Sequence, residues 1–225
     1  MYELEQETYR GYDIKIHQDE DPEDPREWGN LGKMVCSHKR YSLPNELNFD
    51  FDSCESWAEA EKELVEVYDA VIVLPLYMYD HSGLRIKVGS FNGLLPDWHA
   101  YFDSGQIGFI VCRASDILKE YCIEPEELRN NRESYIENAK SILLREVENY
   151  DYYVAGFVYG FIVENPDGEH VGSCCGFYGD TEYPLSEARQ SVDYDIERVR
   201  KLRQDKLKQY IRNKVPLRYR CLPNY

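Results

Sequence analysis

The sequence predicts an α+β fold in which a mixed or antiparallel sheet is combined with three principal helices. Two kinds of pattern support this prediction. Apolar runs and alternating segments bounded by Gly, Pro and Asp are typical of strands. Three longer segments repeat apolar residues at spacings of three and four, which is typical of helices that pack on a core. We expect residues 1–185 to form an acidic core domain, with residues 186–225 forming a basic helix and tail docked on it.

The N-terminal part predicts two short strands separated by a loop. Tyr12, Ile14 and Ile16 alternate with polar residues and indicate the first strand. Residues 19–25 contain two prolines and five carboxylates in seven positions, a composition that fits neither a helix nor a sheet interior. A short strand over residues 34–36 follows this loop and precedes a basic cluster.

The middle of the chain predicts the core of the sheet. Ser56 is a suitable cap for a helix over residues 57–68, with Glu59 completing a capping box. Residues 70–76 are almost all apolar and predict a central strand that is buried on both faces. A short strand over residues 85–89 is expected inside the long loop that follows. A second core strand is expected over residues 106–112, with Ile107, Phe109 and Val111 on one face.

The C-terminal part predicts two helices, a hairpin and a final helix. Ser115 is a suitable cap for a short helix through Tyr121, and Pro125 suits the first turn of a longer helix from Glu126 to about Tyr150. Residues 152–163 and 171–178 have strand patterns, and Asn165–Gly168 between them is a hairpin turn signal. The last helix is expected from Ser186 to about Lys214, with these residues facing inward: Ala188, Val192, Ile196, Val199, Tyr210 and Ile211.

Charge is distributed unevenly along the chain, which has a net charge of −16. Residues 196–225 contain ten basic and two acidic residues, so the other 195 residues carry −24. Such a distribution bears on partners and association rates. An acidic body repels nucleic acid, and we expect the core not to bind it directly.

Seven cysteines, an odd number without CxxC pairs, predict reduced and mostly buried thiols. We find no apolar run long enough to span a membrane and no leader-like start, and therefore expect a cytosolic protein.

Polar residues directly after the central strand form the candidate catalytic site. Asp80, His81 and Ser82 are neighbours in sequence and cannot align as a nucleophilic triad. His81 and Asp103 both follow predicted strand ends, and we expect them within hydrogen-bonding reach. An enzyme would use His81, Asp80, Asp103 and Gln106.

No metal or cofactor site is predicted. The potential metal ligands lack the paired spacing of a zinc site: Cys36, His38, Cys54, His81, His99 and His170. The glycines form neither GxGxxG nor GxxxxGK[ST].

The loop before Pro25 is the candidate partner-binding segment, with carboxylates at Asp19, Glu20, Asp21, Glu23 and Asp24. It has three possible roles: a solvated loop, which is the default for a charge run, a calcium-like cluster, or a mimic of spaced phosphates. The chain also has 20 tyrosines, a residue type common at protein interfaces.

The chain carries four recognisable segments within residues 21–163: DPEDPREWGNLGKMVC, LYMYDHSG, DSGQIGFI and EVENYDYYVAGFVYGF. Together they resemble a family of small bacteriophage and mobile-element proteins that has no assigned activity. The chain departs from that pattern with Phe102 where Trp is usual and with a longer Leu94–Tyr101 insert. The resemblance implies an accessory protein in the cytoplasm of a bacterial host cell, and by analogy an inhibitor of host nucleases of the anti-restriction or anti-CRISPR type.

We therefore expect a non-enzymatic interaction protein, an acidic mimic of nucleic acid that inhibits a host defence nuclease. Its partner would be a host protein with a basic, nucleic-acid-binding surface. The alternative is a small hydrolase or transferase that uses His81 and Asp103. A third possibility is a minor component of a virion.

Overall fold

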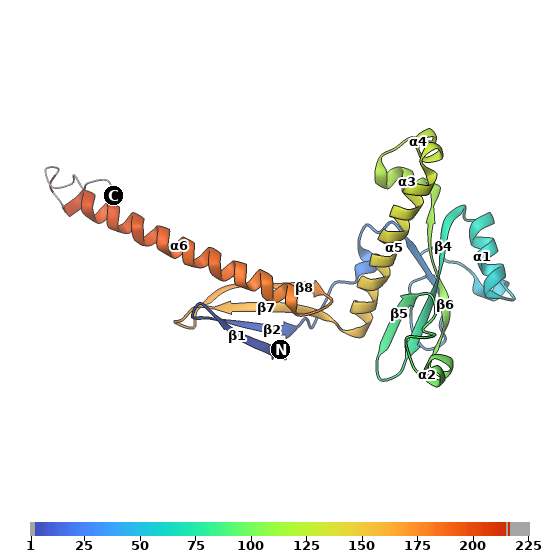
Figure 1. Ribbon diagram of the computed structural model, residues 1–225, viewed down its shortest axis with the longest axis horizontal. Coiled ribbons are helices and arrows are strands. Elements are labelled where there is room, and N and C mark those ends of the chain that lie inside the picture. The colour runs from blue at the N-terminus through green and yellow to red at the C-terminus, as the bar shows by residue number, and fades with distance from the viewer. Residues whose placement is uncertain (1–2, 215, 217–225) are drawn as a thin grey trace. The chain divides into compact units, whose positions relative to one another are not determined.

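The computed structural model describes residues 3–214 and residue 216 (Figure 1). The chain forms two compact units: unit 1 consists of residues 1–20 and 158–225, and unit 2 of residues 21–157. Each unit contains a four-stranded antiparallel sheet and at least one long helix, so the predicted α+β class is confirmed. The division differs from our expected boundary at residue 185, because the last helix packs on strands from both ends of the chain.

The sheet of unit 2 has the strand order β3-β6-β4-β5, with every neighbouring pair antiparallel. Its strands are β3 (Lys33–Cys36), β4 (Ala70–Asp80), β5 (Leu84–Val88) and β6 (Ser104–Arg113). β4 is longer than predicted because its polar end, Tyr77–Asp80, pairs with β5 in a hairpin. Ser82 and Gly83 both have positive φ in the turn of this hairpin.

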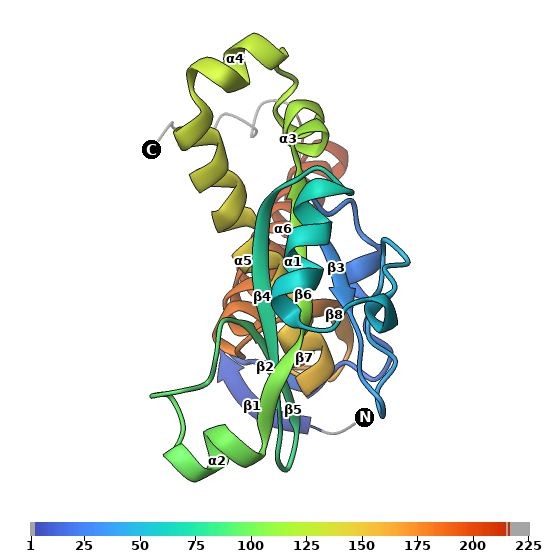
Figure 2. The same cartoon turned by 90° about the vertical axis from the view of Figure 1, so that its right-hand side faces the viewer.

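Helices cover both faces of this sheet, which explains why β6 is buried from Ile107 to Cys112. α1 (Trp57–Glu66) and the 3₁₀ turn η2 (Phe51–Ser53) lie on one face, and Figure 2 shows α1 over β4 and β6. Leu64 of α1 packs there with Phe109 and Val111. α5 (Arg132–Ala155) covers the other face, where Leu143 and Val147 meet Ile110 and Cys112.

Three short helices complete unit 2: α2 (Asp97–Phe102), α3 (Ala114–Tyr121) and α4 (Pro125–Asn130). The sequence analysis missed α2 and predicted α4 and α5 as one helix, which Asn131 in fact interrupts. Residues 152–155 belong to α5 and not to a strand. Gly156, with a φ of 74°, ends that helix in the left-handed conformation that glycine adopts without strain.

The sheet of unit 1 has the order β1-β2-β7-β8 and is antiparallel throughout. Its strands are β1 (Glu3–Tyr9), which was not predicted, β2 (Tyr12–Gln18), β7 (Val158–Glu164) and β8 (His170–Tyr178). The hairpin turn between β7 and β8 is confirmed, because the Gly168 N–H donates to the Asn165 carbonyl oxygen at 2.9 Å.

α6 (Glu182–Lys214) packs on this sheet only through its first half. Ala188 and Val192 are fully buried against Ile14 and Phe161, and the Tyr12 hydroxyl donates to the buried Asp195 carboxylate at 3.0 Å. From Arg200 to Tyr210 every side chain is exposed, and in Figure 1 the helix continues beyond the strands. The sequence predicted four further buried side chains on this helix, and that prediction is wrong. Ile196, Val199 and Ile211 are half-buried, and Tyr210 is exposed. The tail over 217–225 lies outside the described residues.

The cysteines of the described residues are all free thiols. Burial raises the pKa of Cys36 and of Cys112 to about 12. The expectation that most would be buried is wrong for Cys122, Cys174 and Cys175, which are exposed. Two of these lie on the edge strand β8, and Cys221 is outside the described residues. Among the helices that the structure describes, none combines the length and the apolar composition needed to cross a membrane.

The packing of α6 predicts unequal effects of two substitutions. Val192→Ala should lower the free energy of unfolding by about 1–2 kcal/mol, because buried methyl groups are lost and a gap remains. Leu202→Ala on the same helix should cost less than about 0.5 kcal/mol, because that side chain is 49% exposed. Urea denaturation measures both, and equal losses would contradict this division of the helix.

Candidate functional site

The candidate site of unit 2 lies where the end of β4 is next to the start of β6. Asp80 is the last residue of β4, and Asp103 is the C-cap of α2, directly before β6. Because Tyr79 pairs with Ser104, the two aspartates are brought together, and the Asp80 N–H donates to the Asp103 carbonyl oxygen at 2.9 Å.

Two histidines approach the Asp103 carboxylate. His81, in the β4–β5 turn, has its Nδ1 3.3 Å from Asp103 Oδ2, so the expected contact between them is confirmed. His99 Nδ1 lies 2.9 Å from the same oxygen. One potential ligand atom from each of the three residues lies within 4.8 Å of the others. We name His81, His99 and Asp103 the His–Asp cluster.

The cluster is open to solvent on one side. The His81 side chain is 49% exposed, whereas those of Asp103 and His99 are 25% and 18% exposed. Each imidazole also lies against an aromatic ring, His81 against Tyr79 and His99 against Trp98. The cluster can therefore be reached by a small solute while its rings are held by packing.

The other two predicted catalytic residues do not join the cluster. The Asp80 carboxylate accepts hydrogen bonds from Arg40 at 2.7 Å and from the Tyr41 hydroxyl at 2.9 Å. The hydrogen bond to Asp80 raises the pKa of Tyr41. Gln106 donates to the Gly108 carbonyl oxygen at 3.4 Å, within its own strand. Only His81 and Asp103 of the four predicted residues therefore meet.

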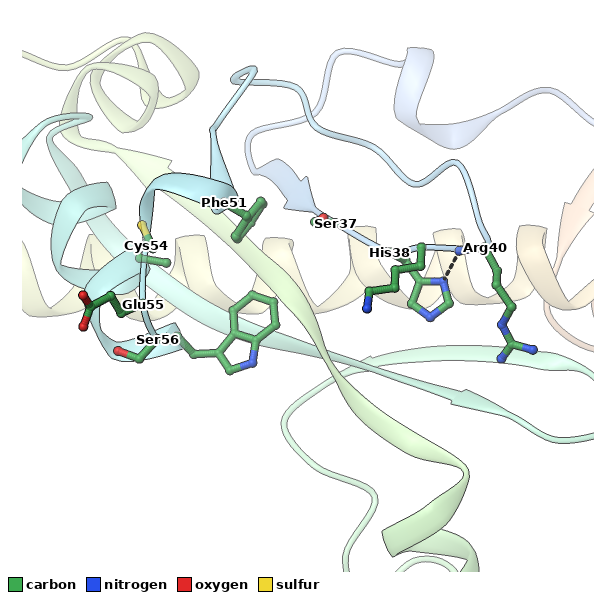
Figure 3. A pocket seen from close by; sticks show the side chains of 10 residues that line it. Ser37, His38, Arg40, Phe51, Cys54, Glu55 and Ser56 are labelled. Atoms are coloured by element: carbon green, nitrogen blue, oxygen red, sulfur yellow. Dashed lines mark hydrogen bonds between the residues drawn. The ribbon is translucent and has the colours of Figure 1, made fainter.

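A pocket of about 680 Å³ lies beside this polar network and shares Arg40 with it (Figure 3). His38, Lys39 and Arg40 provide basic groups, and Phe51 and Trp57 provide aromatic surface. Arg40 thus connects the pocket to Asp80, the neighbour of His81.

The predicted partner-binding loop has partly structural roles. The Asp19 carboxylate accepts a hydrogen bond from the Gly176 N–H, and Asp24 caps the turn η1 (Pro25–Glu27) by accepting from the Arg26 N–H. Glu20, Asp21 and Glu23 have exposed side chains. The division between the units falls between Glu20 and Asp21, so the five carboxylates do not belong to one unit.

A second group of carboxylates lies on and beside η2 and α1. Among the residues from 50 to 66, the only basic residue is Lys62. We name as the α1 acidic face the exposed carboxylates Asp50, Asp52, Glu55, Glu59, Glu61 and Glu66. Ser56 caps the helix as predicted, and Glu59 accepts from the Glu55 N–H instead of the Ser56 N–H. The charge run is visible in the sequence, but the predicted partner-binding segment was the loop over residues 19–24.

His99 was also missed as a site residue. The signal was its spacing from Asp103, because residues four apart lie on one face of a helix. The spacing brings the two side chains together only if residues 97–102 are helical, whereas the sequence predicted a loop there.

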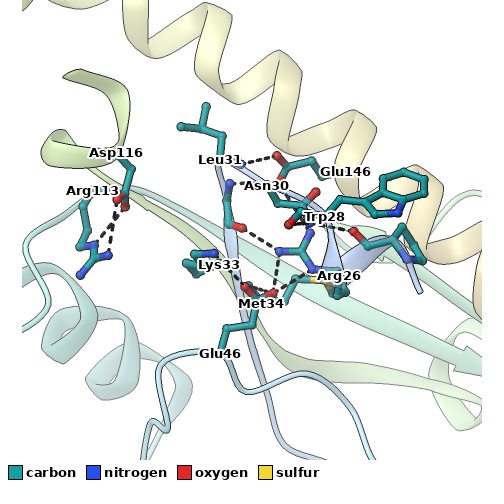
Figure 4. A network of polar contacts seen from close by, with 12 residues as sticks. Arg26, Trp28, Asn30, Leu31, Lys33, Met34, Glu46, Arg113, Asp116 and Glu146 are labelled. Carbon is teal, nitrogen blue, oxygen red and sulfur yellow. Dashed lines mark hydrogen bonds and ion pairs between the residues drawn. The ribbon is translucent and has the colours of Figure 1, made fainter. Parts of the chain in front are cut away.

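A second polar network in unit 2 has a structural role (Figure 4). The Glu146 carboxylate on α5 accepts from the N–H groups of Leu31 and Gly32 at 2.7 and 3.0 Å. Arg26 donates to Glu46 and to the Gly32 carbonyl oxygen. Gly32 is required here, since a Cβ at this position would lie 2.7 Å from Ile110 Cδ1. Burial raises the pKa of Glu146 despite these donors.

No protein-family model, curated protein or solved structure matches this chain.

The Glu146 network predicts a large loss of stability on truncation. Glu146→Ala should lower the free energy of unfolding by about 3–5 kcal/mol, because two buried N–H groups lose their acceptor and Arg26 loses an ion-pair partner. Glu146→Gln keeps one acceptor oxygen and should therefore lower the free energy of unfolding by less than Glu146→Ala does. The matched control is Glu148→Ala, at an exposed position of the same helix. It should change the free energy of unfolding by less than about 0.5 kcal/mol. Chemical denaturation measures all three, and similar losses for Glu146→Ala and Glu148→Ala would refute the structural role.

Proposed function

We propose that this protein acts by binding another protein through its acidic surface, and that the partner has a basic, nucleic-acid-handling surface. The observation that carries the proposal is the α1 acidic face, whose six exposed carboxylates occur in a stretch, residues 50–66, that contains one basic residue, Lys62. Acidic residues outnumber basic residues by 26 to 13 in unit 2 as a whole. Residues 50–66, with seven carboxylates and one lysine, therefore carry −6 of the net charge of −13 in unit 2.

The physical basis is electrostatic complementarity. A concentration of like charge on one face raises the association rate with an oppositely charged surface and rejects partners of the same sign. The field extends about one Debye length, roughly 8 Å at physiological ionic strength. Carboxylates on a rigid helix can replace the phosphates that a nucleic-acid-binding protein normally contacts.

Aromatic side chains next to the acidic face supply contact area. Trp57 on α1 is 38% exposed and lies in contact with Phe51. Aromatic residues beside charge are the usual composition of binding surfaces, because they add apolar area that electrostatics alone lacks. The resemblance to bacteriophage and mobile-element proteins suggests a bacterial defence nuclease as the partner, and this identity is part of the proposal.

Neutralising the α1 acidic face should slow association with the partner. The variant Asp52→Asn, Glu55→Gln, Glu61→Gln and Glu66→Gln leaves the capping residue Glu59 in place. We expect a protein captured from bacterial lysate by the wild type to bind this variant about tenfold more slowly at low salt, with a weaker dependence on salt. Stopped-flow or surface-binding kinetics at several salt concentrations measure the rate.

Two further variants test whether the effect on association comes from the α1 acidic face, from net charge alone or from the loop over residues 19–24. Glu124, Glu126, Glu133 and Glu137 are exposed on α4 and α5, and their change to Gln removes the same charge elsewhere in unit 2. The second variant changes Asp19, Glu20, Asp21, Glu23 and Asp24 to Asn or Gln. If association is insensitive to salt, or if the α4–α5 variant slows it as much as the α1 variant, the α1 acidic face is not the binding surface.

A second candidate function, hydrolysis or group transfer, is favoured by the contact between His81 and Asp103. A carboxylate at Nδ1 orients an imidazole and leaves Nε2 available as a general base toward water. Arg40 and the neighbouring pocket could hold an anionic substrate.

Catalysis by His81 predicts hydrolysis of a simple activated ester, such as p-nitrophenyl acetate, above the rate of a control protein. His81→Ala should reduce that excess rate by about 10²-fold or more, since general bases contribute about 10²–10⁴. His170→Ala, at an exposed position of β8, should leave it unchanged. A wild-type rate equal to that of His81→Ala would exclude this role for His81.

A further inference from the structure

We propose that His81, His99 and Asp103 form a binding site for a divalent transition metal ion of the zinc class. This inference is separate from the proposed binding of a basic protein, since it uses none of the carboxylates of the α1 acidic face. It rests on the distances between the ligand atoms, on the elements that hold them and on their chemistry.

The distances match those between ligands of one metal ion. Zinc bonds of about 2.0–2.1 Å in tetrahedral geometry place neighbouring ligand atoms roughly 3.3 Å apart. Asp103 Oδ2 lies 3.3 Å from His81 Nδ1 and 2.9 Å from His99 Nδ1. All three candidate ligand atoms lie within 4.8 Å of one another.

The backbone holds the three residues in position before any ion arrives. His99 on α2 and Asp103 at its C-cap are four residues apart, and the Asp103 N–H donates to the His99 carbonyl oxygen at 3.0 Å. His81 is attached to the end of β4, which is tied to Asp103 through the Asp80 N–H. Preorganised ligands bind a metal more tightly because less conformational entropy is lost.

The ligand set selects the class of metal. Two imidazoles and one carboxylate favour Zn²⁺, Co²⁺ or Ni²⁺, whereas Ca²⁺ and Mg²⁺ prefer oxygen ligands alone. Asp80 is not counted as a ligand because Arg40 and Tyr41 occupy its carboxylate. Three protein ligands leave a coordination position for water or another small molecule, as in catalytic zinc sites. An ion can reach the site from solvent on the side of His81, whose side chain is half-exposed.

The same contacts would also occur in a cluster that only exchanges hydrogen bonds, and metal titration distinguishes the two cases. Thiols must be removed first, since Cys122, Cys174 and Cys175 are exposed and bind zinc-class metals. We therefore use the full chain with these three residues changed to Ser. Co²⁺ is the probe, because its absorption spectrum reports nitrogen and oxygen ligands and shows any remaining sulfur ligand.

We expect one equivalent of Co²⁺ to bind, with ligand-field absorption and no sulfur charge-transfer band, and Zn²⁺ to displace it. His81→Ala, at the half-exposed position, should weaken binding at least about tenfold. His99→Gln and Asp103→Asn should do the same.

His170→Ala is the matched control, since it removes an exposed histidine outside the cluster and should leave binding unchanged. Circular dichroism identifies any variant that fails to fold, and the fold of His81→Ala is least at risk. The metal should also raise the melting temperature of the wild type and not that of His81→Ala. Absence of stoichiometric binding, or equal binding by wild type and His81→Ala, would overturn the proposal.

Discussion

The antiparallel pairing of β4 with β6 is the constraint on which both the core and the His–Asp cluster of unit 2 depend. β6 is buried on both faces, so its register determines which side chains meet α1 and which meet α5. The same register places Tyr79 opposite Ser104 and therefore Asp80 beside Asp103. A shift of the pairing by one residue would disrupt the core and the cluster together.

An irregularity in this pairing separates the apolar part of β6 from its polar end. Leu76 pairs with Gly108 and the next residue, Tyr77, pairs with Gln106, so Ile107 is an extra residue. A side chain at Gly108 is excluded, because a Cβ there would lie 2.0 Å from the Val35 carbonyl oxygen. Bulges re-aim the residues beyond them, and here those residues lead to Ser104 and Asp103.

Charge and site chemistry are combined in the same unit. The excess of carboxylates in residues 21–157 gives unit 2 a net negative charge, and the His–Asp cluster belongs to the same unit. In unit 1, the exposed second half of α6, residues 200–214, contains seven basic residues and one acidic residue. The fold therefore keeps an acidic and a basic surface on different units of one chain.

The amino-acid sequence by itself determined most of the strands and the three long helical segments, because apolar periodicity reports directly which positions must be buried. It also determined that His81 and Asp103 follow strand ends. Tertiary structure alone decided that Ile107 packs with Ile110 and not with Phe109, since the bulge changes its face. It also decided that residues 97–102 form a helix carrying His99 to Asp103, because so short a helix has little stability apart from the strands that anchor it.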